Sequence, residues 1–154
     1  LKIKPYNSRN TIQRTIDSLR NIADKKQVKI VCSNKSDLNA EYDEDRVVQV
    51  LTNLISNAIK FCDVKKGEII VDYKYDLGYL EVSIKDNGKG VPEQDLPYIF
   101  DKFYQSKNQN IQKPEGSGLG LAICKQIVEN HNGKIWAKNN QKSGATFGFK
   151  LPFK

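Results

Sequence analysis

Four polar side chains share one face of a segment that otherwise has the pattern of an amphipathic helix. The segment DRVVQVLTNLISNAIKF, residues 45–61, carries apolar residues at helical spacing: Val47, Val50, Leu51, Leu54, Ile55, Ala58 and Ile59. Projection at about 100° per residue gathers Gln49, Asn53, Asn57 and Lys60 within an arc of roughly 80° on the other face. These four side chains are therefore the first candidates for chemistry.

Asparagine in the middle of a helix needs a reason, because its side chain competes for the backbone and lowers helix propensity. A face that is merely solvated would more typically carry Glu, Lys and Gln. The amide oxygen of an asparagine such as Asn57 can ligate Mg²⁺, which prefers oxygen ligands. Lys60 follows about one turn later and can contact a phosphate as a point charge. The pattern favours a functional face over a solvated one.

The segment DNGKG, residues 86–90, raises a second possibility. Asn-Gly between two strands is an ordinary hairpin signal, but VPEQDLPYIF, which follows, is not typical of a strand. Gly88 and Gly90 would let the backbone approach a ligand closely. Asp86, at the expected end of a strand, could accept a hydrogen bond from an exocyclic amine.

A third candidate is GSGLGLAICK, residues 116–125, where glycines lead into a helical pattern. The spacing differs from the dinucleotide fingerprint, the preceding segment is a polar loop, and the Gly-Lys-Ser/Thr of a Walker A loop is absent. Free N–H groups at a helix N-terminus attract phosphates, and the helix dipole adds to this attraction. Incidental glycines in a flexible hinge are the alternative, and phosphate binding is the interpretation that we favour.

His131, the only histidine of the chain, invites a catalytic interpretation that its surroundings do not support. It ends a helical pattern, and Asn132 and Gly133 are helix C-cap residues that tolerate the left-handed conformation. It stands at the far end of that helix from the glycines, roughly 15 Å or more away. We expect a structural role for it.

The elements that must position these residues follow from periodicity and turn signals. Helices are predicted at residues 7–26, 45–61 and 117–130. Strands are predicted at residues 28–33, 38–42, 67–75, 79–86, 134–139 and 145–152. Gly78 lies in the turn between two of these strands, where positive φ is tolerated. Residues 104–116 are polar and have the length of a functional loop. Helices on one side of a sheet give a two-layer α+β fold.

Composition sets outer limits. The chain has 154 residues, enough for one domain with a real core, and no apolar run approaches the length of a membrane span. The net charge of +7 suits a nucleic-acid or phosphate partner, but the lysines are scattered and favour a lysine-rich surface instead. Cys32, Cys62 and Cys124 suggest neither a disulfide framework nor a zinc site, and we expect buried free thiols. The chain lacks an initial methionine and a visible signal peptide, so we expect a cytoplasmic segment of a longer protein.

Five segments, in order, resemble a known family: NLISNAIKF, DNGKG, FDKFY, GSGLGLAI and SGATFGFKLP. Together they look like the catalytic, ATP-binding domain of two-component sensor histidine kinases, in the superfamily that also holds DNA gyrase, MutL and a heat-shock chaperone. The resemblance covers the whole chain. It implies a mixed, mostly antiparallel five-stranded sheet packed on three helices, with residues 1–154 as one domain and an ATP lid at about 104–116.

The resemblance assigns roles to individual residues. Asn53 and Asn57 match the paired asparagines of the family's N box, where Asn57 would ligate Mg²⁺. Lys60 would contact phosphate, so that Asn53, Asn57 and Lys60 form the catalytic group. Phe61 would pack near the nucleotide. Asp86 matches the carboxylate that recognises the adenine amino group.

Further nucleotide contacts are implied around the adenine and at the lid. Gly88, Gly90 and Val91 would line the adenine pocket, and Thr146 would support it. Ala145 departs from the family, which often has a second glycine there. The segment that begins the lid would include Phe100, Lys102, Phe103 and Tyr104, with Lys102 where the family often has Arg. The triphosphate would lie on the helix N-terminus formed by Gly116, Ser117, Gly118, Leu119, Gly120 and Leu121.

The identity of residue 53 separates branches of the superfamily. ATP-hydrolysing relatives carry Glu at this position, and Asn53 cannot act as a general base at neutral pH. The resemblance therefore implies binding of Mg-ATP and transfer of its γ-phosphate to a histidine on a separate dimerisation domain, with a response regulator downstream. The alternatives are a non-catalytic ATP-sensing module and a hydrolysing enzyme. Neither a nucleic-acid partner nor membrane contact by this segment is expected, the isolated domain should be monomeric, and a membrane could anchor the parent protein.

Overall fold

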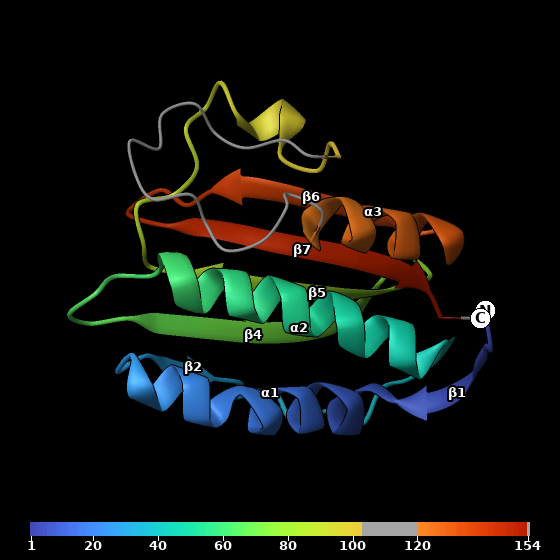
Figure 1. Cartoon of the computed structure of the whole chain (residues 1–154). Helices are drawn as coiled ribbons and strands as arrows, with labels where there is room; N and C mark the ends of the chain where they lie inside the picture. The colour runs from blue at the N-terminus through green and yellow to red at the C-terminus, as the bar shows by residue number, and fades with distance from the viewer. Residues whose placement is uncertain (103–119, 154) are drawn as a thin grey trace.

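The computed structural model describes residues 1–102 and 120–153. Its elements, in chain order, are β1 (Lys4–Asn7), α1 (Ser8–Lys25), β2 (Lys29–Val31), β3 (Asn39–Tyr42), α2 (Glu44–Phe61), β4 (Glu68–Asp76), β5 (Tyr79–Asp86), the 3₁₀ turn η1 (Leu96–Tyr98), α3 (Gly120–Asn130), β6 (Lys134–Asn139) and β7 (Ala145–Pro152). The three helices lie side by side over one face of the sheet (Figure 1). The predicted two-layer α+β architecture is confirmed.

The main sheet has five strands in the order β2-β4-β5-β7-β6. β2 pairs with β4 in parallel, and the other neighbours are antiparallel, so the predicted mixed sheet is confirmed. The β4–β5 hairpin turns through Leu77 at φ 48° and Gly78 at φ 88°. Two successive positive φ angles are those of a type I′ turn, which matches the twist of the flanking strands. The sequence predicted the glycine in this turn but not the strained leucine.

α2 occupies the middle of the helical layer, between α1 and α3 (Figure 1). Asp43 caps its N-terminus by accepting a hydrogen bond from the backbone N–H of Arg46, and acidic residues fill the first turn. The apolar positions predicted for this helix are all buried: Val47, Val50, Leu51, Leu54, Ile55, Ala58 and Ile59. The central position of α2 fixes the orientation of its polar face, and with it the asparagines.

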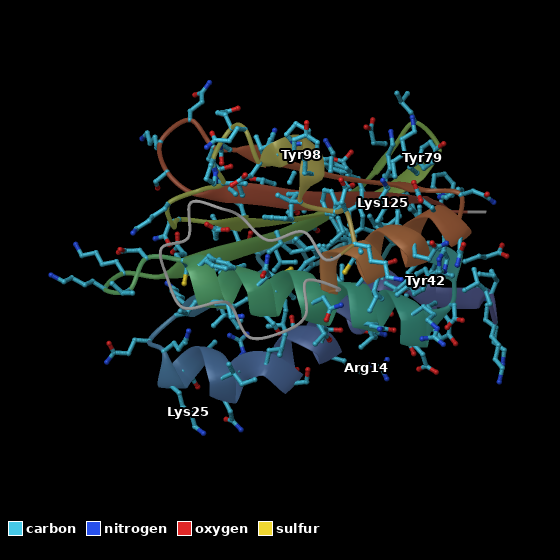
Figure 2. The ribbon with its side chains drawn as sticks, turned by 45° about the horizontal axis from the view of Figure 1, so that its top comes forward. Arg14, Lys25, Tyr42, Tyr79, Tyr98 and Lys125 are labelled. Atoms are coloured by element: carbon cyan, nitrogen blue, oxygen red, sulfur yellow. The ribbon has the colours of Figure 1, made fainter. Side chains whose placement is uncertain are left out.

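A second, two-stranded sheet joins β1 to β3 and was not predicted. Tyr6 of β1 stacks on Tyr42 of β3 with ring centroids 5.3 Å apart. The Tyr42 side chain is buried, and its hydroxyl lies 2.7 Å from the hydroxyl of Thr11 in α1. Tyr42 and Arg14, which pairs with Glu44 at the start of α2, are labelled in Figure 2. The small sheet thus ties the first residues of the chain to the starts of two helices.

The remaining expectations concern the third helix, the lid, membrane-spanning helices and the cysteines. The predicted third helix is present as α3 from Gly120, while residues 117–119 and the expected lid at 104–116 lie outside the described residues. No helix in the described parts is both long and apolar enough to cross a bilayer. Cys62 and Cys124 are buried free thiols as predicted, but Cys32 is only half-buried, because it stands just past the end of β2.

Candidate functional site

Asp86 ends a row of core residues. In β5 the buried side chains alternate at Leu80, Val82, Ile84 and Asp86, all facing the helices. The carboxylate is 6% exposed. A charged group at the end of an apolar row is costly to bury unless hydrogen bonds compensate, and it marks this end of the sheet as a candidate site.

The hydrogen bonds of Asp86 are one-sided. Oδ1 accepts from the backbone N–H of Gly88 at 2.9 Å and of Ala145 at 3.3 Å, whereas no described residue donates to Oδ2. Burial raises the pKa of this carboxyl, and the two backbone hydrogen bonds oppose the rise. Within the described part of the chain, the second oxygen is therefore left open to a donor that enters the site.

Thr146 and Asn140 hold the backbone beside Asp86. The Thr146 hydroxyl donates to Asn140 Oδ1 at 2.6 Å, and Asn140 Nδ2 donates to the carbonyl of Asp86 at 3.1 Å. Gly144, at φ 80°, packs so closely that a Cβ there would lie 2.0 Å from the same carbonyl. The predicted support by Thr146 is thus indirect, and Asn140, which sequence reasoning missed, connects it to Asp86.

Asn139 fixes the next segment in the same way. Its Oδ1 accepts from the N–H of Val91 and its Nδ2 donates to the carbonyl of Val91, both at 2.7 Å. This pair reproduces the hydrogen bonding of a neighbouring strand, and it holds Val91 against the core. Gly90, at φ 82°, packs against the same side chain, because a Cβ there would lie 2.7 Å from Asn139 Oδ1. Asn139 is a second residue that sequence reasoning missed.

Gly88 brings the end of α2 to this site. A Cβ at Gly88 would lie 1.9 Å from the carbonyl oxygen of Phe61, so only glycine permits this approach. Asn87, beside it, accepts from Glu68 N–H at 3.0 Å and donates to the carbonyl of Lys66 at 2.6 Å. These contacts place Phe61, with its partly exposed ring, next to the Asp86 segment.

The polar face of α2 points toward the start of α3. Asn53 Nδ2 donates to the Gly120 carbonyl at 3.4 Å and lies 3.6 Å from the buried Cys124 thiol. Burial raises the pKa of Cys124 to about 11, although the Asn53 hydrogen bond opposes this, so the thiol is inert. Asn57, half-buried, makes no side-chain hydrogen bond to a described residue. Lys60 Nζ lies 6.0 Å from the centroid of the Phe61 ring.

The structure therefore brings together residues from α2, the end of β5, the start of β7 and the start of α3. Of the residues implied at the lid, Phe100 packs edge-on against Phe147 of β7, and Lys102 is exposed. Leu121 packs against the core from the first turn of α3. Phe103, Tyr104, Gly116, Ser117, Gly118 and Leu119 lie outside the described residues.

His131 stands at the opposite end of α3 from Gly120 and is buried. Its Nε2 accepts from the N–H of Asp43 at 3.1 Å, so Nδ1 carries the proton and donates to the Ile127 carbonyl at 2.8 Å. Asn132 has φ 62°, and Gly133 N–H reaches the Val128 carbonyl, which completes a Schellman C-cap. The neutral imidazole joins the end of α3 to the cap of α2, a structural contact.

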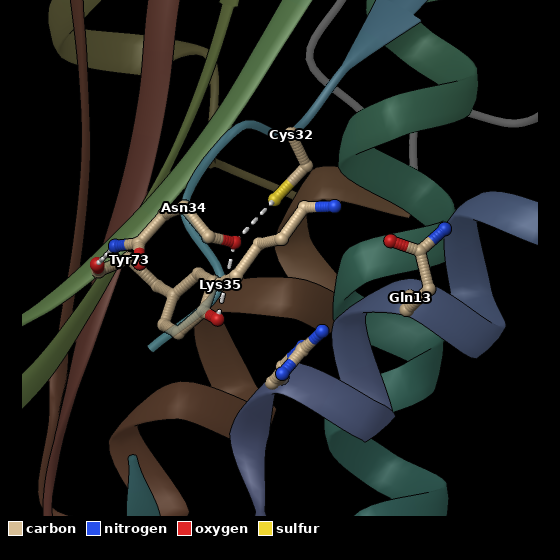
Figure 3. A pocket seen from close by; sticks show the side chains of 6 residues that line it. Gln13, Cys32, Asn34, Lys35 and Tyr73 are labelled. Atoms are coloured by element: carbon tan, nitrogen blue, oxygen red, sulfur yellow. Dashed lines mark hydrogen bonds between the residues drawn. The ribbon is translucent and has the colours of Figure 1, made fainter. Parts of the chain in front are cut away.

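A separate cavity of about 250 Å³ opens beside α1, away from Asp86. Figure 3 shows Gln13, Cys32, Asn34, Lys35 and Tyr73 around it. The Asn34 and Tyr73 side chains are already hydrogen-bonded, since Asn34 Nδ2 donates to the Tyr73 carbonyl and the Tyr73 hydroxyl lies within hydrogen-bond distance of the carbonyls of Asn34 and Ser36. This cavity contains none of the residues predicted for the site.

Comparison with known proteins gives the same picture. The family model of histidine kinase-, DNA gyrase B-, and HSP90-like ATPases matches residues 42–154. Sensor histidine kinase WalK of Bacillus subtilis (strain 168) is 36% identical over 146 residues, which is 94% of this chain and 22% of that protein. The chain therefore spans about a fifth of the length of this relative.

Solved structures match over nearly the whole chain. The nucleotide-free catalytic domain of histidine kinase ThkA has a TM-score of 0.85 at 30% identity and covers 99% of both chains. Full-length ShkA in complex with AMPPNP has a TM-score of 0.86 at 27% identity, with 99% of this chain matching 31% of that one. ThkA in complex with the response regulator TrrA matches 99% of this chain and 42% of that one, at 28% identity and a TM-score of 0.79. The chain belongs to the histidine kinase-, DNA gyrase B- and HSP90-like ATPases and, within them, to the catalytic domains of sensor histidine kinases.

Proposed function

We propose that residues 1–154 form one catalytic domain that binds Mg-ATP and transfers its γ-phosphate to a histidine on a separate dimerisation domain. The observation that carries the proposal is the buried Asp86 carboxylate, with one oxygen held by two backbone N–H groups and the other without a described donor. In this proposal, Oδ2 of Asp86 accepts a hydrogen bond from the adenine amino group, and Gly88, Gly90 and Val91 line the pocket around the base.

The polar face of α2 serves the phosphates. We propose the Asn57 amide oxygen as the protein ligand of Mg²⁺, because this half-buried side chain lies on the polar face of α2 and has no hydrogen bond to a described residue. This fits Mg²⁺, which commonly takes one or two protein ligands and completes its shell with phosphate oxygens and water. When bound, Mg²⁺ neutralises charge on the phosphates. Lys60 contacts phosphate, and Phe61 packs beside the nucleotide.

Phosphoryl transfer asks the protein mainly to position and neutralise charge. Asn53 donates a hydrogen bond to the Gly120 carbonyl and so links α2 to the start of α3. Its amide cannot take a proton from water at neutral pH, so phosphoryl transfer is favoured over hydrolysis. The triphosphate would bind at the start of α3, at Gly120 and Leu121, together with Gly116, Ser117, Gly118 and Leu119, which lie outside the described residues. Lys102 would begin the lid that the family resemblance implies, followed by Phe103 and Tyr104, which lie outside the described residues.

The partners follow from this chemistry. The acceptor is a histidine on the dimerisation domain of the parent protein, and a response regulator receives the phosphoryl group from it, a partner that ThkA has in its complex with TrrA. We propose a cytoplasmic location, because ATP is found there and the chain holds three free thiols. The isolated domain is monomeric.

A direct test adds a sensor-kinase dimerisation domain and γ-labelled ATP to the chain and measures acid-labile label on the added domain. We expect label there and none on the catalytic chain, because His131 is committed to Asp43 and Ile127. ATP binding without transfer to a cognate acceptor domain would favour the ATP-sensing module. Rapid steady-state release of phosphate by the chain alone would favour a hydrolase.

A further inference from the structure

One half of the outer face of the sheet, turned away from the helices, is strongly basic. On β5, β7 and β6 the outward positions alternate with the buried row, and they include Lys85, Lys134, Lys138 and Lys150. The only acid among these outward positions is Glu81. The outward positions of β4, by contrast, carry Glu68, Ile70, Asp72 and Lys74, and are not basic. We name the β5–β7–β6 half the basic face.

The arrangement of the lysines on the basic face is unfavourable for the stability of the fold. Lys134 and Lys150 are direct partners across β6 and β7, and like charges in that position repel. None of the four lysines forms an ion pair with a described residue, although Glu81 is the register partner of Lys150. Lys150 instead lies 4.7 Å from the ring of Tyr79, which is labelled in Figure 2.

Protection of a sheet edge explains only part of this arrangement. β6 is an edge strand, and lysines on edge strands discourage pairing with other chains. That accounts for Lys134 and Lys138. It does not account for Lys85 and Lys150, which lie on the interior strands β5 and β7.

Trp136 lies between Lys134 and Lys138 along β6, and its ring extends over the middle strand of the basic face, β7. Its six-membered ring covers Gly148 of β7, where a Cβ would lie 2.4–2.9 Å from three ring atoms. The indole is therefore seated on the sheet and partly exposed, not raised above it. A partly exposed aromatic ring among unpaired lysines has the features of a binding anchor.

We propose that the basic face binds an acidic protein segment that places an apolar side chain on Trp136. Charge complementarity with lysines that have no ion-pair partner among the described residues supplies attraction, and the single indole supplies one anchor. Nucleic-acid platforms use several stacking aromatics in succession, and membrane insertion needs an aromatic ring that projects. The basic face offers neither of these, so an acidic protein fits best. This inference does not depend on the nucleotide site, which opens on the helical side of the sheet.

The test is calorimetric titration of the whole chain with a short synthetic peptide in which Glu alternates with Ser around a central Phe. Triple substitution Lys134→Glu, Lys138→Glu and Lys150→Glu should weaken peptide binding by about tenfold or more, since each surface charge pair contributes modestly. Trp136→Gln should weaken it by about threefold by removing the anchor. In wild type, the backbone amides whose NMR chemical shifts change on addition of the peptide should lie in β6 and β7.

The matched control is Lys4→Glu, Lys25→Glu and Lys26→Glu, which makes the same change in net charge at exposed positions outside the basic face. We expect peptide binding within about twofold of wild type in this control. Equal losses in both triple variants, or no peptide binding by wild type, would overturn the proposal. So would tighter binding of oligothymidylate, or of vesicles of phosphatidylcholine and phosphatidylserine, at the same face.

Discussion

The two ends of the proposed nucleotide site are built differently. Around Asp86, the side chains of Asn139, Asn140 and Thr146 make hydrogen bonds at 2.6–3.1 Å that hold the backbone in place. Along α2, Asn53 makes only long contacts at 3.4 and 3.6 Å, and Asn57 makes none to a described residue.

In the proposed site, this difference would separate recognition of the base from transfer of the phosphoryl group. The end around Asp86 is complete before a ligand arrives, so its preference for a base is a property of the free protein. The asparagine side chains of α2 make few hydrogen bonds to described residues, so in the proposed site their main interactions would be with metal and phosphate. Truncating a side chain around Asp86 should lower both the stability of the fold and the affinity for nucleotide. Truncating an asparagine of α2 should leave stability unchanged and weaken only the complex with Mg-ATP.

The largest effect on ATP affinity is expected for Asp86→Asn. The asparagine oxygen would keep the two backbone N–H groups, which turns the NH₂ toward the adenine amino group and replaces attraction by repulsion. We expect a loss of about 2–3 kcal/mol, roughly 30- to 150-fold in affinity, by titration calorimetry. GTP serves as the control nucleotide. Equal ATP affinity in wild type and variant would contradict the assignment of the base site.

Asn139→Ala should act on both fold and binding, because it releases both hydrogen bonds to Val91. We expect a loss of about 1–3 kcal/mol in the free energy of unfolding and about a tenfold weaker ATP affinity. Denaturant unfolding and calorimetry measure the two. Asn34→Ala, which removes comparable hydrogen bonds beside the separate cavity, should lower stability and leave ATP affinity intact.

Asn57→Ala should show the opposite selectivity. The side chain has no hydrogen bond to a described residue to lose, so the unfolding free energy should change by less than about 0.5 kcal/mol. Affinity for ATP with Mg²⁺ should fall about tenfold, while affinity for ATP in the presence of a chelator stays as in wild type. A loss of equal size with and without the metal would remove Asn57 from the metal site.

A smaller effect concerns pH. Burial raises the pKa of Asp86 above its usual 3.8 in the folded chain, so the folded state binds its proton more tightly than the unfolded state. The free energy of unfolding of wild type should therefore fall, relative to Asp86→Asn, as pH rises from 3.8 through the folded pKa. Paired denaturant curves over that window measure the difference. A rising difference would mean that the two backbone hydrogen bonds outweigh burial.

The smallest effect on nucleotide binding is expected for His131→Ala. The variant leaves the N–H of Asp43 without its acceptor and opens a small cavity, which should lower the unfolding free energy by about 1–3 kcal/mol. ATP affinity should stay within about twofold of wild type, because His131 lies at the far end of α3. A large loss of affinity in a variant that remains folded would give the imidazole a functional role.

The sequence predicted the parts of this molecule that periodicity governs. The buried stripe of α2 and strands β6 and β7 were predicted residue for residue, since alternating and helical patterns follow directly from the core. Strand β1 was missed because KPYN has no alternation and contains Pro5, and because its pairing depends on β3, more than thirty residues away.

The site divides in the same way. Asp86, Asn53 and Asn57 carried signals in the sequence, because each is an unusual residue type for its position in a strand or helix. Asn139 and Asn140 carried none, since asparagines at the end of a strand are ordinary turn residues. Their importance arises from tertiary structure, which brings the segment after β5 and the end of β6 together.

Trp136 is the single tryptophan of the chain, and it is seated on Gly148 on the side of the sheet away from the helices. When excitation is selective for indole over the seven tyrosines, its fluorescence therefore reports on one place in the molecule. A negatively charged quencher or a bound acidic protein segment should change the emission of Trp136. ATP, which would bind on the other side of the sheet, should leave the spectrum nearly unchanged. The chain carries its own optical label for telling events on one side of the sheet from events on the other.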